Sequence, residues 1–369
     1  MIIRAKTKEL LQTRELTQRQ KDNTKLNKEE MDNKSTILKS YPQRLVLVLE
    51  LTNACNLRCI MCGRDEAEFA PTVFKLDYLK KLEYLLNIVE EVTLFGWGEP
   101  TMHPQFIDIL KYLNDFPVRK YFVTNGMRLN KIKDALFDYK VDIMAISLDG
   151  AKPETNDRIR FGGNFDFIIK NIKEIVKQKR ERNLDYPYMN FVMTLMDSNI
   201  EELPNLVSLA SQIGLEEVKG VYLTVFTKNL LNETLYNKRD KVAYIYMQTE
   251  ELAKKLNIKL KLPYLQGEDI AGDKYHKDCF VAYRDFFLAS DGFVRPCQST
   301  AVKFLKFEDY DNFEDMWNGH EFQEFRKNVN DKNSMCNECK RCFQSSHANW
   351  NNELSFIQIN QQFAPEWEK

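Results

Sequence analysis

The sequence predicts an α/β protein built around a parallel sheet that curves into part of a barrel. From residue 44 onward, short runs of β-branched and apolar residues alternate six times with longer stretches at helical spacing. Such alternation is typical of right-handed βαβ crossovers. With 369 residues, of which 43% are hydrophobic, the chain is long enough for one large domain and a smaller one.

The expected helices carry apolar residues on one face. The first places Leu76, Leu79, Leu82, Leu85 and Val89 on one side. In chain order we expect strands over residues 44–51, 91–95, 120–124, 142–148, 189–196 and 218–226, and helices over 76–89, 104–114, 130–138, 166–182, 200–212 and 235–256.

The first 43 residues differ in character from the rest of the chain. They carry ten Lys or Arg against six Asp or Glu and little apolar periodicity, which favours a solvated leader, either loosely helical or disordered. We therefore expect four parts: a polar extension over 1–43, a partial barrel over 44–265, a small C-terminal domain over 266–345 and a tail over 346–369.

Charge and hydropathy exclude several classes of partner. A net charge of -1 gives no basic field that would draw the chain to nucleic acid or an anionic membrane. No run of about 18 apolar residues occurs, and the N-terminus lacks the apolar core of a signal peptide. We expect a cytoplasmic protein with no nucleic-acid or membrane partner, in which clustered cysteines indicate metal or catalysis before disulfides.

Three of the eight cysteines fall within eight positions after the first predicted strand, in ELTNACNLRCIMCGRD (50–65). Structural zinc sites take four protein ligands, so Cys55, Cys59 and Cys62 are one short. Three thiolates can instead hold three irons of a cube-shaped iron–sulfur cluster and leave the fourth iron open for a substrate or cofactor.

Three further motifs follow the next strands: GWGEP (96–100), TNG (124–126) and SLDG (147–150). The C-terminal ends of parallel strands meet at one mouth of a barrel, where active sites lie. We therefore expect the cysteine loop and these three motifs to converge.

The C-x3-C-x2-C loop after the first strand, followed by a glycine and acidic motif on the next strand end, resembles the radical S-adenosylmethionine (SAM) superfamily. The resemblance implies a partial (β/α)6 TIM-like barrel in which Cys55, Cys59 and Cys62 ligate a 4Fe-4S cluster whose open iron chelates SAM. Reductive cleavage of SAM would give a 5'-deoxyadenosyl radical that abstracts hydrogen from a substrate C–H bond. A flavodoxin- or ferredoxin-type protein would donate the electron.

The resemblance also assigns SAM contacts to the other strand ends. Glu99 would face the amino group of SAM, and Gly98 would allow its close approach. The ribose and carboxylate contacts would come from Asn125, Ser147, Asp149, and Arg158 or Arg160, although Ser, Asp and Gly also make good turns. Trp97 stands where the family usually has glycine, either as a pocket wall or as simple packing.

The remaining five cysteines lie near the C-terminus. Two of them, Cys279 and Cys297, flank a predicted hairpin with SDG as its turn, and a helix is expected within NFEDMWNGHEFQEFRKNV (312–329). This order resembles the SPASM and twitch extensions of radical SAM enzymes, which hold auxiliary iron–sulfur clusters. Five cysteines suit one auxiliary 4Fe-4S cluster, with preferred ligands Cys279, Cys297, Cys336 and Cys339.

Two questions stay open in this region. Cys342 could replace Cys339 as a ligand, be a buried thiol, or give a hydrogen atom to a substrate radical. A zinc ribbon is the alternative to an iron cluster. None of the four histidines has a spacing that adds a metal site. We expect His103 to have a surface or capping role, with support of the SAM pocket as the alternative. His276 could donate to a cluster sulfur, and His320 and His347 have no assigned role.

The sequence therefore predicts a radical SAM oxidoreductase that acts on a small molecule, such as an aminocyclitol or sugar, or on a peptide. The auxiliary cluster would accept an electron or bind the substrate. The alternative is a peptide maturase that forms thioether or carbon–carbon links or epimerises residues. Residues 1–43 look too short and polar for a leader-binding domain, which shifts the interpretation toward a small molecule or short peptide. Minor alternatives are a glycyl-radical activase and a zinc-binding scaffold.

Overall fold

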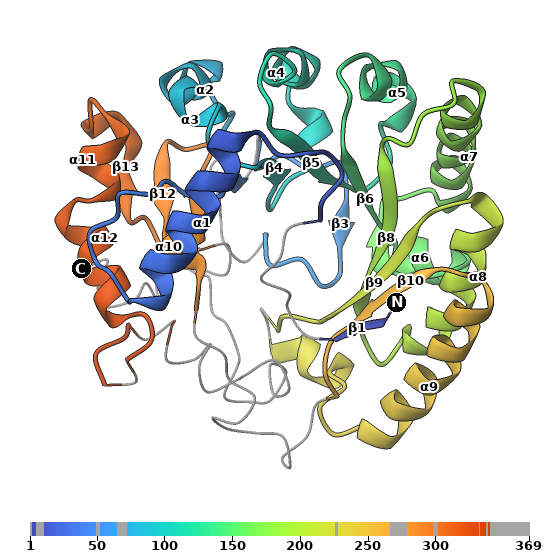
Figure 1. Cartoon of the computed structure of the whole chain (residues 1–369). Helices are drawn as coiled ribbons and strands as arrows, with labels where there is room; N and C mark the ends of the chain where they lie inside the picture. Colours follow the sequence, from blue (N-terminus) through green and yellow to red (C-terminus); the bar gives the residue numbers. More distant parts are fainter. Residues whose placement is uncertain are drawn as a thin grey trace.

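The main sheet forms an open, curved wall with helices on its outer side (Figure 1). In the order of pairing its strands are β1–β10–β9–β8–β6–β5–β4–β2–β11–β12–β13. The computed structural model describes residues 2–4, 11–48, 52–64, 72–225, 228–265, 279–297, 302–331, 333–336 and 339.

All six predicted strands are present and run parallel to their neighbours. They are β2 (Arg44–Val48), β4 (Glu91–Phe95), β5 (Arg119–Thr124), β6 (Ile143–Ser147), β8 (Tyr188–Leu195) and β9 (Glu217–Tyr222). Two strands that we did not predict, β10 (Lys259–Leu262) and β1 (Ile2–Arg4), extend the sheet in parallel. The predicted fold class is confirmed.

The helices between the strands bury their apolar faces against the outer side of the sheet. They are α2 (Leu76–Lys81), α3 (Glu83–Leu86), α4 (Phe106–Leu113), α5 (Leu129–Asp138), α6 (Pro153–Ile159), α7 (Phe165–Glu181), α8 (Leu203–Ile213) and α9 (Arg239–Lys255). The helix expected over 76–89 breaks at Leu82, and α6 was not predicted. Leu79, Leu110 and Ile172 are fully buried, each worth about 1.5–3 kcal/mol.

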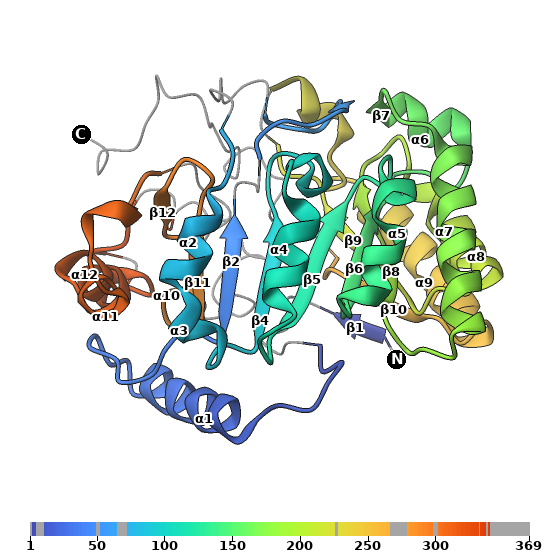
Figure 2. The same ribbon diagram turned by 90° about the horizontal axis from the view of Figure 1, so that it is seen from above.

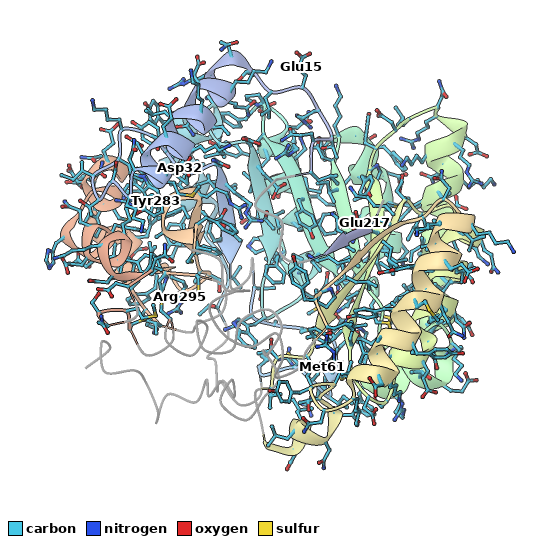
Figure 3. All side chains as sticks on the ribbon, turned by 60° about the horizontal axis from the view of Figure 1, so that its bottom comes forward. Glu15, Asp32, Met61, Glu217, Tyr283 and Arg295 are labelled. Atoms are coloured by element: carbon cyan, nitrogen blue, oxygen red, sulfur yellow. The ribbon has the colours of Figure 1, made fainter. Side chains whose placement is uncertain are left out.

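Charged residues occupy the interior of the barrel near the N-terminal ends of the strands. Glu217 of β9 accepts ion pairs from Lys261 at 3.0 Å and Lys259 at 3.6 Å (Figure 3). Arg44 of β2 pairs with Asp285 at 3.0 Å. Burying a charge costs free energy unless the charge is paired, so these ion pairs stabilise the N-terminal end of the barrel. The reactive groups lie at the opposite, C-terminal ends of the strands.

Helix α1 (Gln18–Asp32) crosses the N-terminal edges of the strands as a strap (Figure 2). Its buried amides bind main-chain carbonyls: Gln20 Nε2 donates to Val89 at 2.8 Å and to Pro117 at 3.1 Å, and Asn27 Nδ2 donates to Tyr283 at 2.9 Å. The helical form that we expected for this region is present, but it is packed against the strand bases and is not a solvated leader. The sequence signal failed because this helix packs through amide hydrogen bonds and not through an apolar face.

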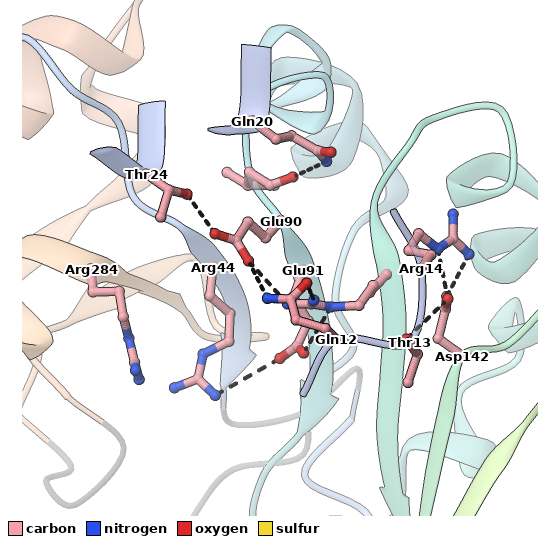
Figure 4. A network of polar contacts seen from close by, with 12 residues as sticks. Gln12, Thr13, Arg14, Gln20, Thr24, Arg44, Glu90, Glu91, Asp142 and Arg284 are labelled. Carbon is pink, nitrogen blue, oxygen red and sulfur yellow. Dashed lines mark hydrogen bonds and ion pairs between the residues drawn. The ribbon is translucent and has the colours of Figure 1, made fainter. Parts of the chain in front are cut away.

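Side chains around the strap form a continuous polar network (Figure 4). Thr24 donates to Glu90, Arg119 contacts Glu90 at 3.3 Å, and Arg14 makes two hydrogen bonds of 2.6 Å to Asp142. The strap and the residues that precede it are thereby anchored at the bases of β4, β5 and β6.

The C-terminal extension continues the same sheet. The predicted hairpin is confirmed as β11 (Asp285–Leu288) and β12 (Phe293–Arg295), and β11 also pairs in parallel with β2. Strand β13 (Leu305–Lys306) and the four-residue α10 (Val281–Arg284) complete this part. The extension is thus joined to the barrel by main-chain hydrogen bonds.

The helix expected within 312–329 is two helices, α11 (Phe313–Trp317) and α12 (His320–Asn328). Gly319 is the N-cap of α12 and ends the first helix. Asn318, at the break, exchanges hydrogen bonds with the main chain of Leu38, and Trp317 Nε1 donates to Ser40. Residues that follow the strap are therefore held by the extension.

No helix among the described residues has the length and apolar character needed to cross a bilayer.

We expect Gln20→Ala to lower the free energy of unfolding by about 1–3 kcal/mol, because two buried carbonyl groups lose their donor. The matched control is Gln18→Ala on the same helix, since Gln18 is exposed and bonds only to Asp22. Urea denaturation would measure both variants. Equal stability of the two would contradict the strap's role in holding β4 and β5.

Candidate functional site

The cysteine loop lies beyond the C-terminal end of β2. Cys55, Cys59 and Cys62 are half-buried and form no disulfide. Within the loop, β3 (Arg58–Cys59) pairs antiparallel with β7 (Arg160–Phe161), which sets Cys59 opposite Arg160. Met61 anchors the loop in an apolar cluster with Ile159, Met196 and Leu223, as Figure 3 helps to locate.

The loop after β4 packs directly on the cysteine loop. A Cβ atom on Gly98 would stand 2.1 Å from the carbonyl oxygen of Thr52 and 2.6 Å from that of Ala54, so only glycine fits. The next residue, Glu99, donates its N–H to the same Ala54 oxygen at 3.0 Å. The close approach that we expected at Gly98 is thus made in this structure to the cysteine loop itself.

The Glu99 carboxylate is buried and fully engaged by the protein. Oε1 accepts from the hydroxyls of Thr101 (2.6 Å) and Thr124 (2.7 Å), and Oε2 accepts from the N–H of Asn125 (2.7 Å). Burial raises the pKa of Glu99, and these hydrogen bonds act in the opposite direction. We assigned no role to Thr101 or Thr124, although Thr124 is the first residue of the TNG motif and Thr101 directly follows GWGEP.

Asn125 links the third strand end to the first cysteine. Its Nδ2 lies 3.7 Å from Cys55 Sγ and donates to Asn56 Oδ1 at 2.9 Å. Hydrogen bonds to ligand sulfur help to set the potential of an iron–sulfur cluster. The role expected of Asn125, a SAM contact, stays a prediction, and the structure adds this contact with sulfur.

Asp149 and Arg160 form a buried ion pair of 2.7 Å beside the second cysteine. Arg160 Nη1 lies 3.9 Å from Cys59 Sγ. Burial alone would lower the pKa of Arg160, but Asp149 and the thiol of Cys59 raise it. Burial also raises the pKa of Cys59 to about 12, although the positive charge of Arg160 acts to lower it. A cation is thus held against the sulfur that must become a thiolate.

Two other candidates lie at the same edge of the sheet. Ser147 ends β6 and is half-buried, in register with Val192 of β8. Arg158 is exposed on α6. Of the two arginines that we proposed, the structure places Arg160 in the site and Arg158 outside it.

Trp97 packs on the apolar cluster that also holds Cys297, one of the C-terminal cysteines. Its half-buried indole contacts an apolar cluster of Val46, Phe287 and Ala289, and Cys297 packs on the same cluster. Because Val46 belongs to β2 and Phe287 to β11, the indole joins the barrel to the extension at the mouth.

The C-terminal cysteines gather beside the hairpin. Cys279, Cys297, Cys336 and Cys339 are half-buried and unbridged. The N–H of Cys339 lies 3.4 Å from Cys336 Sγ. A hydrogen bond with Cys336, burial, and the nearby thiols of Cys297 and Cys279 raise the pKa of Cys339. Cys342, His276 and His347 lie outside the described residues.

The donors at both groups suit iron–sulfur clusters. Within the described residues, no three His, Cys, Asp or Glu side chains converge closely enough to hold one metal ion. A cube-shaped cluster takes one thiolate per iron, so its ligands stand further apart than those of a single ion. In the first group, half-buried thiols flanked by the amide of Asn125 and the guanidinium of Arg160 fit such a cluster. In the second group, four half-buried thiols supply the ligands.

His103 has the capping role that we expected. Its Nδ1 accepts from the N–H of Gln105 at 3.0 Å, and its Nε2 lies 2.9 Å from the carbonyl oxygen of Phe74. Burial lowers the pKa of His103, although the hydrogen bond to Phe74 acts to raise it. His320 is exposed at the start of α12.

Comparison with protein families decides the identity of the fold. Residues 49–210 match the model of the radical SAM superfamily, and residues 279–343 match that of the SPASM iron–sulfur cluster-binding domain. The chain belongs to the radical SAM superfamily. Radical SAM proteins bind a 4Fe-4S cluster and SAM, and SPASM domains bind auxiliary iron–sulfur clusters. That the cysteines of the first loop hold the former stays a prediction.

Relatives of this radical SAM protein include a maturase and a cofactor-modifying protein. It is 32% identical over 181 residues to mycofactocin maturase MftC of Mycobacterium tuberculosis, covering 46% of this chain and 42% of the maturase. It is 26% identical over 258 residues to the tungsten-containing aldehyde ferredoxin oxidoreductase cofactor-modifying protein of Pyrococcus furiosus, covering 68% and 70%. The match to MftC therefore spans less than half of the length of that maturase, whereas the match to the Pyrococcus protein spans about two thirds of both chains.

Solved structures share the fold. Streptococcus suis SuiB bound to precursor peptide SuiA superposes with a TM-score of 0.64 at 16% identity, covering 91% of this chain and 80% of that chain. The enzyme anSMEcpe, with bound AdoMet and the Cp18Cys peptide, gives 0.57 at 15% identity, covering 87% and 94%.

We expect Arg160→Ala to destabilise the protein by about 3–5 kcal/mol, because Asp149 would remain buried without its cation. Arg158→Ala is the matched control and should stay within about 0.5 kcal/mol, because Arg158 is exposed. Chemical denaturation measures stability, and iron content after anaerobic reconstitution measures the site. An Arg160→Ala variant as stable and iron-rich as the control would contradict this role.

We expect acid to destabilise the protein partly through His103. The folded state binds this proton more weakly than the unfolded chain, so the free energy of unfolding falls as the pH drops through the unfolded value near 6.5. His103→Gln should show a shallower decline than the wild type, measured by urea denaturation from about pH 7.5 to about pH 5.5. Parallel pH profiles would show that His103 does not contribute.

Proposed function

We propose that this protein is a radical SAM enzyme that modifies a peptide. The observation that carries the proposal is the convergence of the cysteine loop with Gly98, Glu99 and Asn125 at one mouth, in a chain with a SPASM region. Maturases among its relatives, and a structural neighbour solved with a precursor peptide, favour a peptide substrate. This choice favours the alternative in our sequence interpretation over the small-molecule oxidoreductase.

The residues of the site have distinct tasks in this proposal. When bound, the 4Fe-4S cluster supplies the electron that splits SAM into methionine and a 5'-deoxyadenosyl radical. Cys55, Cys59 and Cys62 hold that cluster. Asn125 donates toward the sulfur of Cys55, and Arg160 sets positive charge beside that of Cys59, so both favour the reduced state needed for electron transfer.

The SPASM region completes the site. We assign one auxiliary 4Fe-4S cluster to Cys279, Cys297, Cys336 and Cys339, because these four thiols lie together. We assign Trp97 as a wall of the substrate pocket, because it packs on the apolar cluster that joins β2, β11 and Cys297.

A second candidate is modification of a small molecule or cofactor. The match to the Pyrococcus cofactor-modifying protein extends over more of both chains than the match to the maturase. The two candidates share the SAM chemistry and differ only in what donates the hydrogen atom.

We expect the anaerobically reconstituted protein, given SAM and dithionite, to release 5'-deoxyadenosine and methionine. Cys59→Ala should reduce release to the level without protein, because one iron loses its ligand. Arg158→Ala, an exposed neighbour, is the control and should retain the wild-type rate. Wild-type protein that never cleaves SAM would overturn the proposed function.

Substrate class is tested with a deuterated peptide encoded by a short reading frame beside the gene. Transfer of deuterium into 5'-deoxyadenosine, with a mass change in the peptide, is expected for a maturase. SAM cleavage without transfer from any such peptide would favour the small-molecule candidate.

A further inference from the structure

The β3–β7 ribbon has one face toward the cysteine site and one toward solvent. Cys59 pairs in register with Arg160, and Arg58 pairs with Phe161. Successive residues of a strand point to opposite faces. Arg160 is buried against Cys59 and Asp149, whereas Phe161 is 66% exposed and Arg58 is exposed. The ribbon is therefore a wall one strand layer thick, with Cys59 on its inner face and Arg58 and Phe161 on its outer face.

The outer face of this wall carries apolar residues that nothing among the described residues covers. Ile60, next to Cys59, is 45% exposed, and Phe161 is among the most exposed large apolar side chains. Both lie on the same two-stranded ribbon, Ile60 directly after β3 and Phe161 in β7, and exposed apolar side chains gathered on one surface and rimmed by polar residues are a feature of interaction sites. Figure 2 shows β7 beside α6, at the end of the molecule opposite α1.

The charge around this face is mainly positive. Arg58 on β3 and Arg158 on α6 are exposed. On the same helix, Glu154 is exposed, and the carboxylate of Asp157 is turned inward to accept from the N–H of Phe165 at 2.9 Å. An acidic protein surface is the complement of this rim.

We propose that the outer face of the β3–β7 ribbon, formed by Arg58, Ile60, Phe161 and Arg158, is the docking surface for an acidic one-electron carrier protein. The inference rests on the proposed function. The carrier loses one electron and SAM gains it; the C5'–S bond then breaks to give methionine and the 5'-deoxyadenosyl radical. Docking here puts the carrier one strand away from Cys59.

The orientation of the ribbon favours an electron carrier over the peptide substrate. A substrate must bring a C–H bond to the face of the ribbon that carries Cys59, whereas Arg58 and Phe161 lie on the opposite, exposed face. An electron needs only proximity and can cross the wall. Ile60 and Phe161 would supply the desolvated centre of the contact, and the arginines its steering charge.

The test uses the reconstituted holoprotein and a bacterial flavodoxin. Arg58→Glu combined with Phe161→Ser should lower the rate of flavodoxin-driven SAM cleavage at sub-saturating carrier by about tenfold or more, because rim charge acts on association. The dithionite-driven rate should be unchanged, since both side chains are exposed. The matched control is Arg182→Glu with Tyr244→Ser, two exposed residues away from the ribbon, at the C-cap of α7 and on α9, with wild-type rates from both reductants.

Binding gives a readout independent of turnover. Titration calorimetry with oxidised flavodoxin should show weaker binding to the ribbon variant than to the control, and added salt should weaken wild-type binding more than variant binding. Equal flavodoxin-driven rates and equal binding for the ribbon variant and the control would overturn the proposal. Loss of peptide modification with dithionite, while flavodoxin binding persists, would also overturn it and make the ribbon a substrate surface. Absence of dithionite-driven cleavage in the wild type would instead refute the proposed function.

Discussion

The buried carboxylate of Glu99 ties together the loops on which the site depends. One oxygen receives the hydroxyls that follow β4 and end β5, and the other receives the main chain of Asn125. Gly98 then lets this joined unit rest against the carbonyl groups of the cysteine loop. The thiols are therefore positioned by main-chain contacts and one desolvated charge, which explains how a loop beyond the end of a strand can hold a fixed geometry.

Second to this tie is the arrangement of positive charge and amide donors next to sulfur. Asn125 reaches Cys55, and Arg160 reaches Cys59 from a strand that pairs with the cysteine loop. Asp149 holds Arg160 in place and compensates its charge. The resulting electrostatics are built from three different strand ends, so no single motif contains them.

The sequence predicted the six strands well, because a parallel sheet with covered faces needs continuous β-branched and apolar runs. It missed the strap, because Gln20 and Asn27 bury amides that look like surface residues in a pattern of hydrophobicity. It could not choose between Arg158 and Arg160, since only the pairing of β7 with β3 turns one inward. The predicted helix over 312–329 overlooked the capping position of Gly319, although a glycine after an asparagine is itself a stop signal.

The parallel pairing of β11 with β2 has a consequence for how such an enzyme can change its substrate. Both groups of cysteines are connected to strands of one continuous hydrogen-bonded sheet, since β11 of the extension pairs with β2 of the barrel. The strap also binds the extension, through Asn27 and Tyr283. A hinge motion at this join would have to break main-chain hydrogen bonds. The distance between the two groups of cysteines is therefore fixed. Adaptation to larger or smaller substrates then has to change the lengths of the loops and the sizes of the side chains at the mouth. Substitution of Trp97 is the most direct such change.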